Sequence, residues 1–565
     1  MDISQSNLYK NVLDIIENIS NAAFVTFDLE MSGISTRPKN SPGDRTLDVA
    51  KPTLQQQYDE VRSTAETFQI LQMGITVVEE VRDKEFYISR PYNFDLSPLS
   101  YGGVDIGLQR TIRFNSSSCD FLQKNGFDFG RLFRSGVPYL SRAEDFELRS
   151  EYEQRAERNS KIPDLFIEDE DKKALEFCDY TRKSIIDWLN KPVQKFVNIG
   201  TKDEKLTGFQ RRLVYQIVRK DFPELRAFGR CDGDFMQIER LDVEQEAIHR
   251  KYRLQKLDTK LFKQKGLGWV FEALCGGDLS GIDPLWIYNQ EDEEPEKLPA
   301  GIATRIKDVE AKLKLKNHVI IGHNLFMDIA FLYKTFVGPL PTQVEDFQKE
   351  IHQLFPRVID TKFLATHGLE SMHIRSSLKE VLKPFLKIDN PLILLHQDHR
   401  GYGSSFGRDH EAGYDSWMTA ELFVKLSAKL MADQNVGEEI DKARKSPCAD
   451  NESCQDIIED NNQINNNSRD TSESTSLTQE TEHINNPYIS SNPFAVLETI
   501  GDRQDVAMTE ASTTQKWLPH FSSSFWKPYI NKIRVNSIES GFFDLAISES
   551  SETDDQHRKK ICTSL

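Results

Sequence analysis

The sequence predicts an α/β fold with a mixed β-sheet, and two patterns lead to this prediction. Residues 68–79 and 85–94 have the apolar, β-branched composition of strands, and the polar turn at 81–84 between them predicts a hairpin. An earlier β-type run precedes this pair, and helical segments and a second strand-to-helix junction follow it. Strands that alternate with helices in this way are typical of a sheet covered by helices.

The first elements along the chain are a short helix and a strand. Residues 9–19 carry apolar side chains at positions 12, 13, 15, 16 and 19, which is the spacing of an amphipathic helix. The apolar run 23–27 then predicts a strand. Further helices are expected at 118–127 and 141–158, and the second of them is heavily charged.

The chain is long enough for two or three domains. It has 565 residues, of which 38% are hydrophobic and 10% aromatic, enough for sizeable cores. No apolar run is long enough to span a bilayer, and the first ten residues lack the apolar core of a signal peptide. The seven cysteines include no Cys-x-x-Cys pair, which indicates free thiols in a reducing compartment. We therefore expect a soluble protein without membrane contact, in the cytoplasm, the nucleus or both.

Composition divides the chain into five segments. Residues 165–262 are highly charged and helix-rich, and they look like an insertion. Residues 446–490 hold nine Asp/Glu against one Lys/Arg, which predicts disorder, whereas the aromatic stretch 514–546 predicts renewed order, docked on the core or binding another protein. The expected segments are a core in two parts (1–164 and 263–432), an inserted small domain (165–262), a disordered acidic Asn/Ser-rich linker (433–513) and a short C-terminal segment (514–565).

The net charge of −18 argues against a broad nucleic-acid footprint, but its distribution weakens that argument. Residues 431–565 carry 23 acidic and 12 basic side chains, so they supply −11, and the first 430 residues supply only −7. Within the insert, basic and aromatic residues alternate. This pattern suits single-stranded nucleic acid, and it equally suits an amphipathic helix with a solvated basic face. The residues are Phe209, Arg211, Arg212, Tyr215, Arg219, Lys220 and Phe222.

Three acidic motifs stand in apolar surroundings. Asp28 and Glu30 end the first strand two residues apart, so both carboxylates leave the same face of that strand. Asp328 lies within the apolar run LFMDIAFLY after a second strand, where a charge is normally excluded. A competing interpretation is that Asn324 caps a helix and that Asp328 is favoured in its first turn. Clustered carboxylates repel one another unless divalent cations neutralise them.

His410 and Asp415, in HEAGYD, form the most specific of these motifs. Asp415 begins an apolar helix, and a histidine on a nearby glycine-containing loop has the near-neutral pKa of a proton acceptor. Two cations among four carboxylates are a common arrangement for phosphodiester hydrolysis. The set therefore predicts a metal-dependent 3′ exonuclease. A serine-nucleophile mechanism is less favoured because no Gly-x-Ser-x-Gly motif occurs.

The ordered motifs resemble the poly(A)-specific ribonuclease family, in the DEDDh branch of the RNase D/RNase T exonucleases. The resembling segments, which cover most of residues 1–430, are FDLEMSGIS, SSSCDFLQKNGFDFGRLFRSGVPYL, GFQRRLVYQ, IGHNLFMD, LFPRVIDTKFLATH and HEAGYD. The resemblance implies an RNase H-like core with an inserted small α/β domain of the Arg-x-x-x-His class.

The resemblance also implies the roles of individual residues. Asp28, Glu30, Asp328 and Asp415 would hold two Mg²⁺, for which Mn²⁺ can substitute, and His410 would be the catalytic histidine. RNA would be contacted by five further residues, namely Met31, Ser32, Ile34, Asn324 and Lys362. The implied reaction is 3′-to-5′ hydrolysis of single-stranded RNA, including poly(A) tails, that releases nucleoside 5′-monophosphates.

The sequence departs from the family pattern in two places. The insert has Arg212-x-x-x-Gln216 in place of Arg-x-x-x-His, and an acidic stretch stands where some members carry an RRM-like domain. Some relatives without that domain trim 3′ ends of small RNAs held by Argonaute-type proteins, which is an alternative function here. A non-catalytic RNA-binding protein on a nuclease fold is a second alternative. The resemblance further implies a homodimer.

Overall fold

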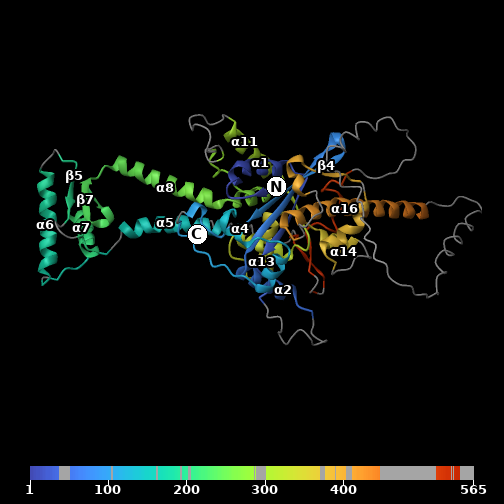
Figure 1. Cartoon of the computed structure of the whole chain (residues 1–565), viewed down its shortest axis with the longest axis horizontal. Coiled ribbons are helices and arrows are strands. Elements are labelled where there is room, and N and C mark those ends of the chain that lie inside the picture. The colour runs from blue at the N-terminus through green and yellow to red at the C-terminus, as the bar shows by residue number, and fades with distance from the viewer. Residues whose placement is uncertain are drawn as a thin grey trace, which may run out of the picture. The chain divides into compact units, whose positions relative to one another are not determined.

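The computed structural model places the chain in two units (Figure 1). The first holds residues 1–103, 109–143 and the chain from 264 onward, and the second holds 104–108 and 144–263. The residues described are 1–36, 51–103, 106–160, 163–168, 170–190, 194–200, 205–284, 287, 301–368, 376–388, 390–402, 410–445, 517–535, 538 and 540–547.

A mixed seven-stranded sheet forms the centre of the first unit. Its order is β1-β4-β3-β2-β8-β9, and β10 also pairs with β4. The central strands β2, β3 and β4 are antiparallel, whereas β8 and β9 continue parallel to β2, which confirms the predicted α/β fold with a mixed sheet and its hairpin. The strands are β1 (Asp2–Ile3), β2 (Phe24–Met31), β3 (Ile70–Val81), β4 (Phe86–Asp95), β8 (Val319–Gly322), β9 (Arg357–Asp360) and β10 (Ile393–Leu395).

Helices of the first unit follow the apolar periodicity of the sequence. In α1 the buried side chains include Val12, Ile15, Ile16 and Ile19, as the spacing predicts. Helix α2 was not predicted from the sequence, although Thr53 and Gln56 form a capping box at its start. These helices are α1 (Leu8–Asn21), α2 (Leu54–Thr67), α3 (Ser116–Lys124), α4 (Phe129–Arg134), α9 (Gly268–Leu274), α11 (Ile302–Leu315), α12 (Phe326–Phe336), α13 (Val344–Leu354), α14 (Thr361–Gly368), α15 (Leu378–Leu382) and α16 (Ala412–Lys445).

The long helix α16 packs across β2, β3 and β4. Aromatic rings fill the core beneath it, where the ring centroids of Phe24 and Phe423 lie 5.0 Å apart. The aromatic C-terminal segment joins the same core, because Trp526 stacks on Phe423 at 5.4 Å and is almost fully buried. Its short hairpin consists of β11 (Lys532–Arg534) and β12 (Phe542–Asp544). Docking on the core, one of the two expectations for this segment, is what the structure shows.

The C-terminal segment also extends the edge of the sheet at β9. The backbone N–H of Asn531 donates to the carbonyl oxygen of Val358 at 2.7 Å, and the N–H of Val358 donates to the side-chain oxygen of Asn531 at 2.9 Å. The backbone N–H and the side-chain oxygen of Asn531 thus pair with the C=O and the N–H of Val358. These two groups lie at the edge of the sheet and would otherwise be unpaired.

The second unit has its own sheet and core. Its antiparallel sheet has the order β5-β7-β6, and α6 and α7 pack together beside it (Figure 1). The unit starts at residue 144, earlier than the insert expected at 165, because the charged helix α5 pairs with α8 through Arg149 and Asp258 at 2.5 Å. The elements are α5 (Arg142–Ser160), α6 (Lys172–Leu189), β5 (Phe196–Ile199), α7 (Gly208–Asp221), β6 (Leu225–Arg230), β7 (Phe235–Arg240) and α8 (Val243–Lys265).

Helix α16 runs further than the sequence suggested. Residues 433–445, which we expected to belong to the linker, continue the helix to Lys445. Extending a helix that is already packed needs only moderate helix propensity, since the costly nucleation step has been made. The remainder of the expected disordered linker lies outside the described residues. In the part of the chain that the structure describes, no helix has the length and apolar character needed to cross a membrane.

Candidate active site

Two carboxylates of the site stand on β2. Side chains alternate along a strand, so Thr26, Asp28 and Glu30 share one face. The hydroxyl of Thr26 donates to the carbonyl oxygen of Ser416 at 2.7 Å, which shows that this face lies against α16. Asp28 and Glu30 are partly exposed in the midst of buried neighbours. The sheet therefore presents both acids toward the start of α16.

The third carboxylate, Asp328, lies in the first turn of α12. The turn before it contains Asn324 with a φ of 66°, a left-handed conformation that asparagine tolerates better than most residues. The backbone N–H groups of Asn324 and Leu325 donate to the carboxylate of Asp360 at 2.8 and 3.4 Å. Asp360 thus fixes the turn from which Asp328 projects.

Asp415 and His410 complete the site from the start of α16. Ligand-type atoms of Glu30, His410 and Asp415 all lie within 4.8 Å of one another, although 380 residues separate the first two in sequence. His410 is exposed, and its φ is 66°. The ring of Phe121, from α3, meets the imidazole edge to face with a centroid distance of 4.6 Å. The histidine therefore neighbours both an aromatic ring and two carboxylates.

The four carboxylates interact electrostatically. Burial raises the pKa of Asp28 well above its usual range, and the charges of Asp415, Asp328 and Glu30 raise it further. Burial, and then Asp415 and Asp328, raise the pKa of Glu30 in the same way. Burial and the neighbouring Asp360 raise the pKa of Asp328 to about 8. Such a cluster favours either protons or cations, and an all-oxygen carboxylate set is the one that Mg²⁺ prefers.

A half-buried histidine beside the site, His323, is held neutral. Burial and the nearby Lys362 lower the pKa of His323 to about 3. Its Nδ1 lies 2.9 Å from the hydroxyl of Thr361, and that hydroxyl donates to the carbonyl oxygen of Gly322. The hydroxyl proton of Thr361 is therefore already used in a hydrogen bond, so Nδ1 of His323 carries a hydrogen and donates it to that hydroxyl. His323 serves as a fixed donor between β8 and the start of α14.

The five residues expected to contact RNA lie in different surroundings. Ile34 is 59% exposed, and Asn324 is exposed as well. Met31 is buried, and the buried hydroxyl of Ser32 accepts a hydrogen bond from the backbone of Gln69 at 3.0 Å. Lys362 is also buried, with its ammonium on the carbonyl oxygen of Ser376. Only Ile34 and Asn324 offer exposed side chains to a ligand in this structure.

The basic residues of the insert take part in internal contacts. Arg212 donates to the carbonyl oxygen of Pro163 at 2.8 Å, and Gln216 exchanges two hydrogen bonds with the backbone of Leu165. Arg219 and Lys220 both pair with Asp164. These contacts hold residues 163–165 against α7. They favour the structural interpretation of the Arg-x-x-x-Gln motif over the RNA-binding one.

Two residues of the site were not singled out from the sequence. Asp360 ends the apolar strand run RVID, which is the same signal that identified Asp28, an acid at the end of a buried strand. Phe121 gave no comparable signal, because a phenylalanine on an amphipathic helix is usually a core residue. It is 46% exposed, and the imidazole of His410 is its ring partner.

The fold and this group of side chains define an α/β protein with an acidic site of the kind that divalent cations occupy. The sequence model of the CAF1 family ribonucleases matches residues 3–423, and the chain belongs to this family. The poly(A)-specific ribonuclease PARN of Homo sapiens is 26% identical over 443 residues, covering 76% of this chain and 62% of the relative. PARN of Danio rerio is 25% identical over 452 residues, with 76% and 59% covered.

Two further proteins are similar over most of the chain. The pre-piRNA 3′-exonuclease trimmer of Bombyx mori is 25% identical over 449 residues, which cover 75% of this chain and 71% of the relative. The solved structure of S. pombe Pop2p in its Mg²⁺- and Mn²⁺-bound form has a TM-score of 0.34 and 14% identity, covering 76% of this chain and 91% of that one. The alignments with the two PARN relatives span 59% and 62% of those proteins' own length.

Proposed function

We propose that this protein is a 3′-to-5′ exoribonuclease that hydrolyses single-stranded RNA to nucleoside 5′-monophosphates. The observation that carries the proposal is the convergence of Glu30, Asp415 and His410 within 4.8 Å, with Asp28 and Asp328 coupled to them electrostatically. Membership of the CAF1 ribonuclease family supports it. The core is taken to be RNase H-like, with Asp28 and Glu30 on its central strand.

The carboxylates would hold two Mg²⁺, or Mn²⁺ in their place. Burial and mutual repulsion raise the pKa values of Asp28 and Glu30, and the pKa of Asp328 is raised as well. Cations fit such a cluster because they relieve the repulsion that otherwise favours protonation. When bound, divalent cations supply positive charge against the charge that develops on the phosphodiester in the transition state. The metal ligands in this proposal are Asp28, Glu30, Asp328 and Asp415.

The protein's own residues carry the remaining steps. His410 is exposed and lies beside the carboxylates, so its imidazole can take the proton from an attacking water. Asn324 and Ile34, the exposed members of the predicted contact set, bind the terminal nucleotides through the backbone and through apolar contact with a base. The phosphodiester is then held between β2 and the turn before α12.

The substrate is a single-stranded RNA 3′ end, of which poly(A) tails are one class. PARN carries poly(A) specificity in its name, and the Bombyx mori relative is named as a pre-piRNA 3′ trimmer, so both deadenylation and small-RNA trimming have precedent among similar proteins. Stacking of bases on side chains discriminates weakly between bases. We therefore expect only a modest preference for A-tails. Argonaute-type complexes that carry small RNA would be partners if the protein trims small RNAs.

The catalytic proposal is tested with a 5′-labelled RNA oligomer, Mg²⁺ and the full chain. Asp28→Asn and Asp415→Asn should each lower the rate by at least about 100-fold, because each removes a charge on which cation binding depends. Asp59→Asn, which changes an exposed acid on α2, is the matched control and should retain full activity. Near-wild-type hydrolysis by either site variant would show that the acids are not the catalytic set. A wild-type protein that binds the RNA but releases no nucleotides would favour the non-catalytic alternative.

Substrate choice is tested with equal-length A, U and mixed-sequence tails, each with and without a methylguanosine cap, and with a DNA oligomer of the same sequence. Rates within a few-fold of one another on the RNA tails, and a slower rate on DNA, are expected. Strict A-specificity with cap stimulation would instead identify a dedicated mRNA deadenylase.

We further propose that the protein forms a homodimer. The expectation comes from the family resemblance, since the structure contains a single chain. Light scattering over a range of concentrations tests it. A mass near the 65.0 kDa of one chain at every concentration would refute it.

A further inference from the structure

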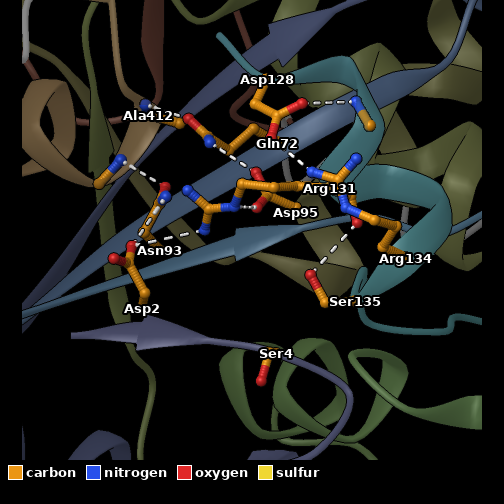
Figure 2. A network of polar contacts seen from close by, with 12 residues as sticks. Asp2, Ser4, Gln72, Asn93, Asp95, Asp128, Arg131, Arg134, Ser135 and Ala412 are labelled. Carbon is orange, nitrogen blue, oxygen red and sulfur yellow. Dashed lines mark hydrogen bonds and ion pairs between the residues drawn. The ribbon is translucent and has the colours of Figure 1, made fainter. Parts of the chain in front are cut away.

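The start of α16 is held by side-chain amides from the central sheet. The backbone N–H of Ala412 donates to Oε1 of Gln72 on β3 at 2.9 Å, and the N–H of Gly413 donates to Oδ1 of Asn93 on β4 at 3.0 Å. Figure 2 shows Gln72 between Ala412 and Asp95. Unpaired N–H groups at a helix start are costly when buried, and here the sheet satisfies two of them.

These amides stand in line with the carboxylates of β2. In the antiparallel ladder, Glu30 lies opposite Gln72, and Gln72 lies opposite Asp95 on the next strand. Residues directly opposite each other in such a ladder share a face of the sheet. Glu30 of the site, the Gln72 amide and the Asp95 carboxylate therefore form one row across three strands, beneath the start of α16.

A neighbouring row explains how closely the helix can approach. Asp28 lies opposite Gly74, and Gly74 lies opposite Asn93. A Cβ atom at Gly74 would stand 1.9 Å from the carbonyl oxygen of Ala412, so only glycine leaves room for the helix there. The amide of Asn93 bonds Gly413 beside this gap. The helix start thus fills the space above Gly74, next to Asp28.

Ionic groups fix which way the Gln72 amide faces. Its Nε2 donates to Oδ1 of Asp95 at 2.7 Å, and Asp95 in turn pairs with Nε of Arg131 on α4 at 2.8 Å (Figure 2). A carboxylate that is paired with a guanidinium accepts hydrogen bonds, so the nitrogen of the amide must face Asp95 and its oxygen must face Ala412. Arg131, acting through Asp95, therefore fixes which atom of the Gln72 amide donates and which accepts.

We propose that Gln72, oriented by Asp95 and Arg131, and Asn93 are positioning residues that place Asp415 and His410 against the carboxylates of β2. The proposal rests on the function proposed above, since it concerns the same cation site. None of the four residues is a ligand in it. They act on cation binding through the position of the start of α16 over the sheet, because Asp415 follows Ala412 by less than one helical turn.

The expected effect is a loss of cation affinity without loss of the fold. Residues that orient metal ligands typically change metal affinity by about 10- to 100-fold when they are replaced. Gln72→Leu removes the acceptor for the Ala412 N–H and the donor to Asp95 while keeping a side chain of similar size.

The test measures Mn²⁺ binding to the full chain by calorimetry without RNA, together with thermal unfolding and the Mg²⁺ dependence of RNA hydrolysis. Gln264→Leu is the matched control, because Gln264 is equally buried and bonds the backbone of Tyr101 and Tyr139 instead of α16. Both leucine variants should lose thermal stability. Only Gln72→Leu should weaken Mn²⁺ binding by about 10-fold or more and raise the Mg²⁺ needed for half-maximal hydrolysis.

Arg131→Met provides a variant that is expected to fold even if Gln72→Leu does not, since the Arg131 side chain is 41% exposed. It should weaken Mn²⁺ binding by a few-fold by freeing Asp95. Unchanged Mn²⁺ affinity in Gln72→Leu and Arg131→Met, or an equal loss in Gln264→Leu, would overturn the proposal. Mn²⁺ binding is measured without RNA. A wild-type protein that binds Mn²⁺ but leaves RNA intact would therefore refute the proposed function, while the effect of the variants on Mn²⁺ affinity would still test the positioning role. A wild-type protein that binds no Mn²⁺ would overturn both.

Discussion

Asp328 and Asp415 reach the same site from two helix starts that are anchored in different ways. The turn that leads to Asp328 is held by a buried carboxylate, Asp360, which accepts the N–H groups of Asn324, Leu325, Lys362 and Arg534. The start of α16 before Asp415 is held by neutral amides of Gln72 and Asn93. One helix start is thus fastened by an anion and the other by uncharged groups.

The two anchors differ in the charge that they add to the site. Burial, and then the charge of Asp360, raise the pKa of Asp328 to about 8, so the charge of this anchor reaches the site. An amide anchor adds no net charge, and the nearest ion of its network, Asp95, is paired with Arg131. A buried carboxylate accepts more hydrogen bonds than one amide, but its charge must be compensated. The start of α12 is therefore held more firmly than the start of α16. Its anchor also adds a negative charge that a bound cation has to offset.

The largest expected effect comes from removing the anionic anchor. Asp360→Leu leaves four backbone N–H donors without their acceptor, and it should lower the free energy of unfolding by about 3–5 kcal/mol. Gln72→Leu frees one N–H donor and should cost about 1–3 kcal/mol. Urea unfolding of both variants measures the difference. Equal losses would mean that the carboxylate of Asp360 and the amide of Gln72 are equivalent anchors.

A smaller effect is expected from the C-terminal segment that supports the same anchor. Asn531 has a φ of 61°, so Asn531→Gly keeps the backbone unstrained while it removes the side-chain bonds to Val358 and to the carbonyl oxygen of Pro356. We expect a loss of about 1–3 kcal/mol in urea unfolding. Gly541→Asn, at a φ of 72° in the same hairpin, tests backbone tolerance alone and should change stability much less. A loss below about 0.5 kcal/mol in Asn531→Gly would show that the segment does not brace β9.

The smallest expected effect is the dependence on pH that His318 contributes on the α12 side. Burial lowers the pKa of His318, just before β8, to about 4 from 6.5. The unfolded chain therefore binds a proton more readily than the folded one, and stability is complete above pH 6.5 and falls as the pH drops toward 4. The loss between pH 7 and 5.5 should be about 1 kcal/mol. The amides of Gln72 and Asn93 do not titrate in this range.

Urea unfolding at several pH values measures this loss. His318→Leu should reduce the loss of stability between pH 7 and 5.5 by about 1 kcal/mol. His520→Leu, which changes an exposed histidine of the C-terminal segment, should leave that loss as in the wild type. Burial also lowers the pKa of His323 and of His399 to about 3, so these two residues keep their own contributions. An unchanged slope in His318→Leu would show that other groups cause the acid sensitivity.

The sequence was informative wherever a charged residue interrupts an apolar pattern. Asp28, Glu30 and Asp328 were found because a carboxylate in such a run needs an explanation, and Asp360 satisfies the same criterion although it was passed over. Gln72 and Asn93 gave no such signal, since polar residues at alternate positions of a strand usually face solvent. Their role depends on a partner, Ala412, that lies 340 residues from Gln72 in sequence. Pairing over that separation is a property of the fold, not of a local pattern.

The elements that were missed or misplaced have local and tertiary causes. Helix α2 carries few apolar residues, and only its Thr53–Gln56 capping box marks it. Helix α5 was assigned to the core because its charge pattern is uninformative about its partner, which is α8. The mixed sheet, by contrast, followed from strand periodicity and the short polar turn of the hairpin, both of which are local.

The return of the chain after residue 516 changes what a premature stop codon would do. Trp526 and Phe521 cover Phe423 and Phe24 of the core, and Arg534 supplies one of the four donors to Asp360. Translation that ended anywhere in the preceding acidic stretch would leave every residue of the candidate site in place, yet it would uncover these rings and open the edge of β9. Such a product would carry an intact set of acids on a core prone to aggregation. Genetic lesions far downstream of Asp415 should therefore resemble loss of the whole nuclease unit.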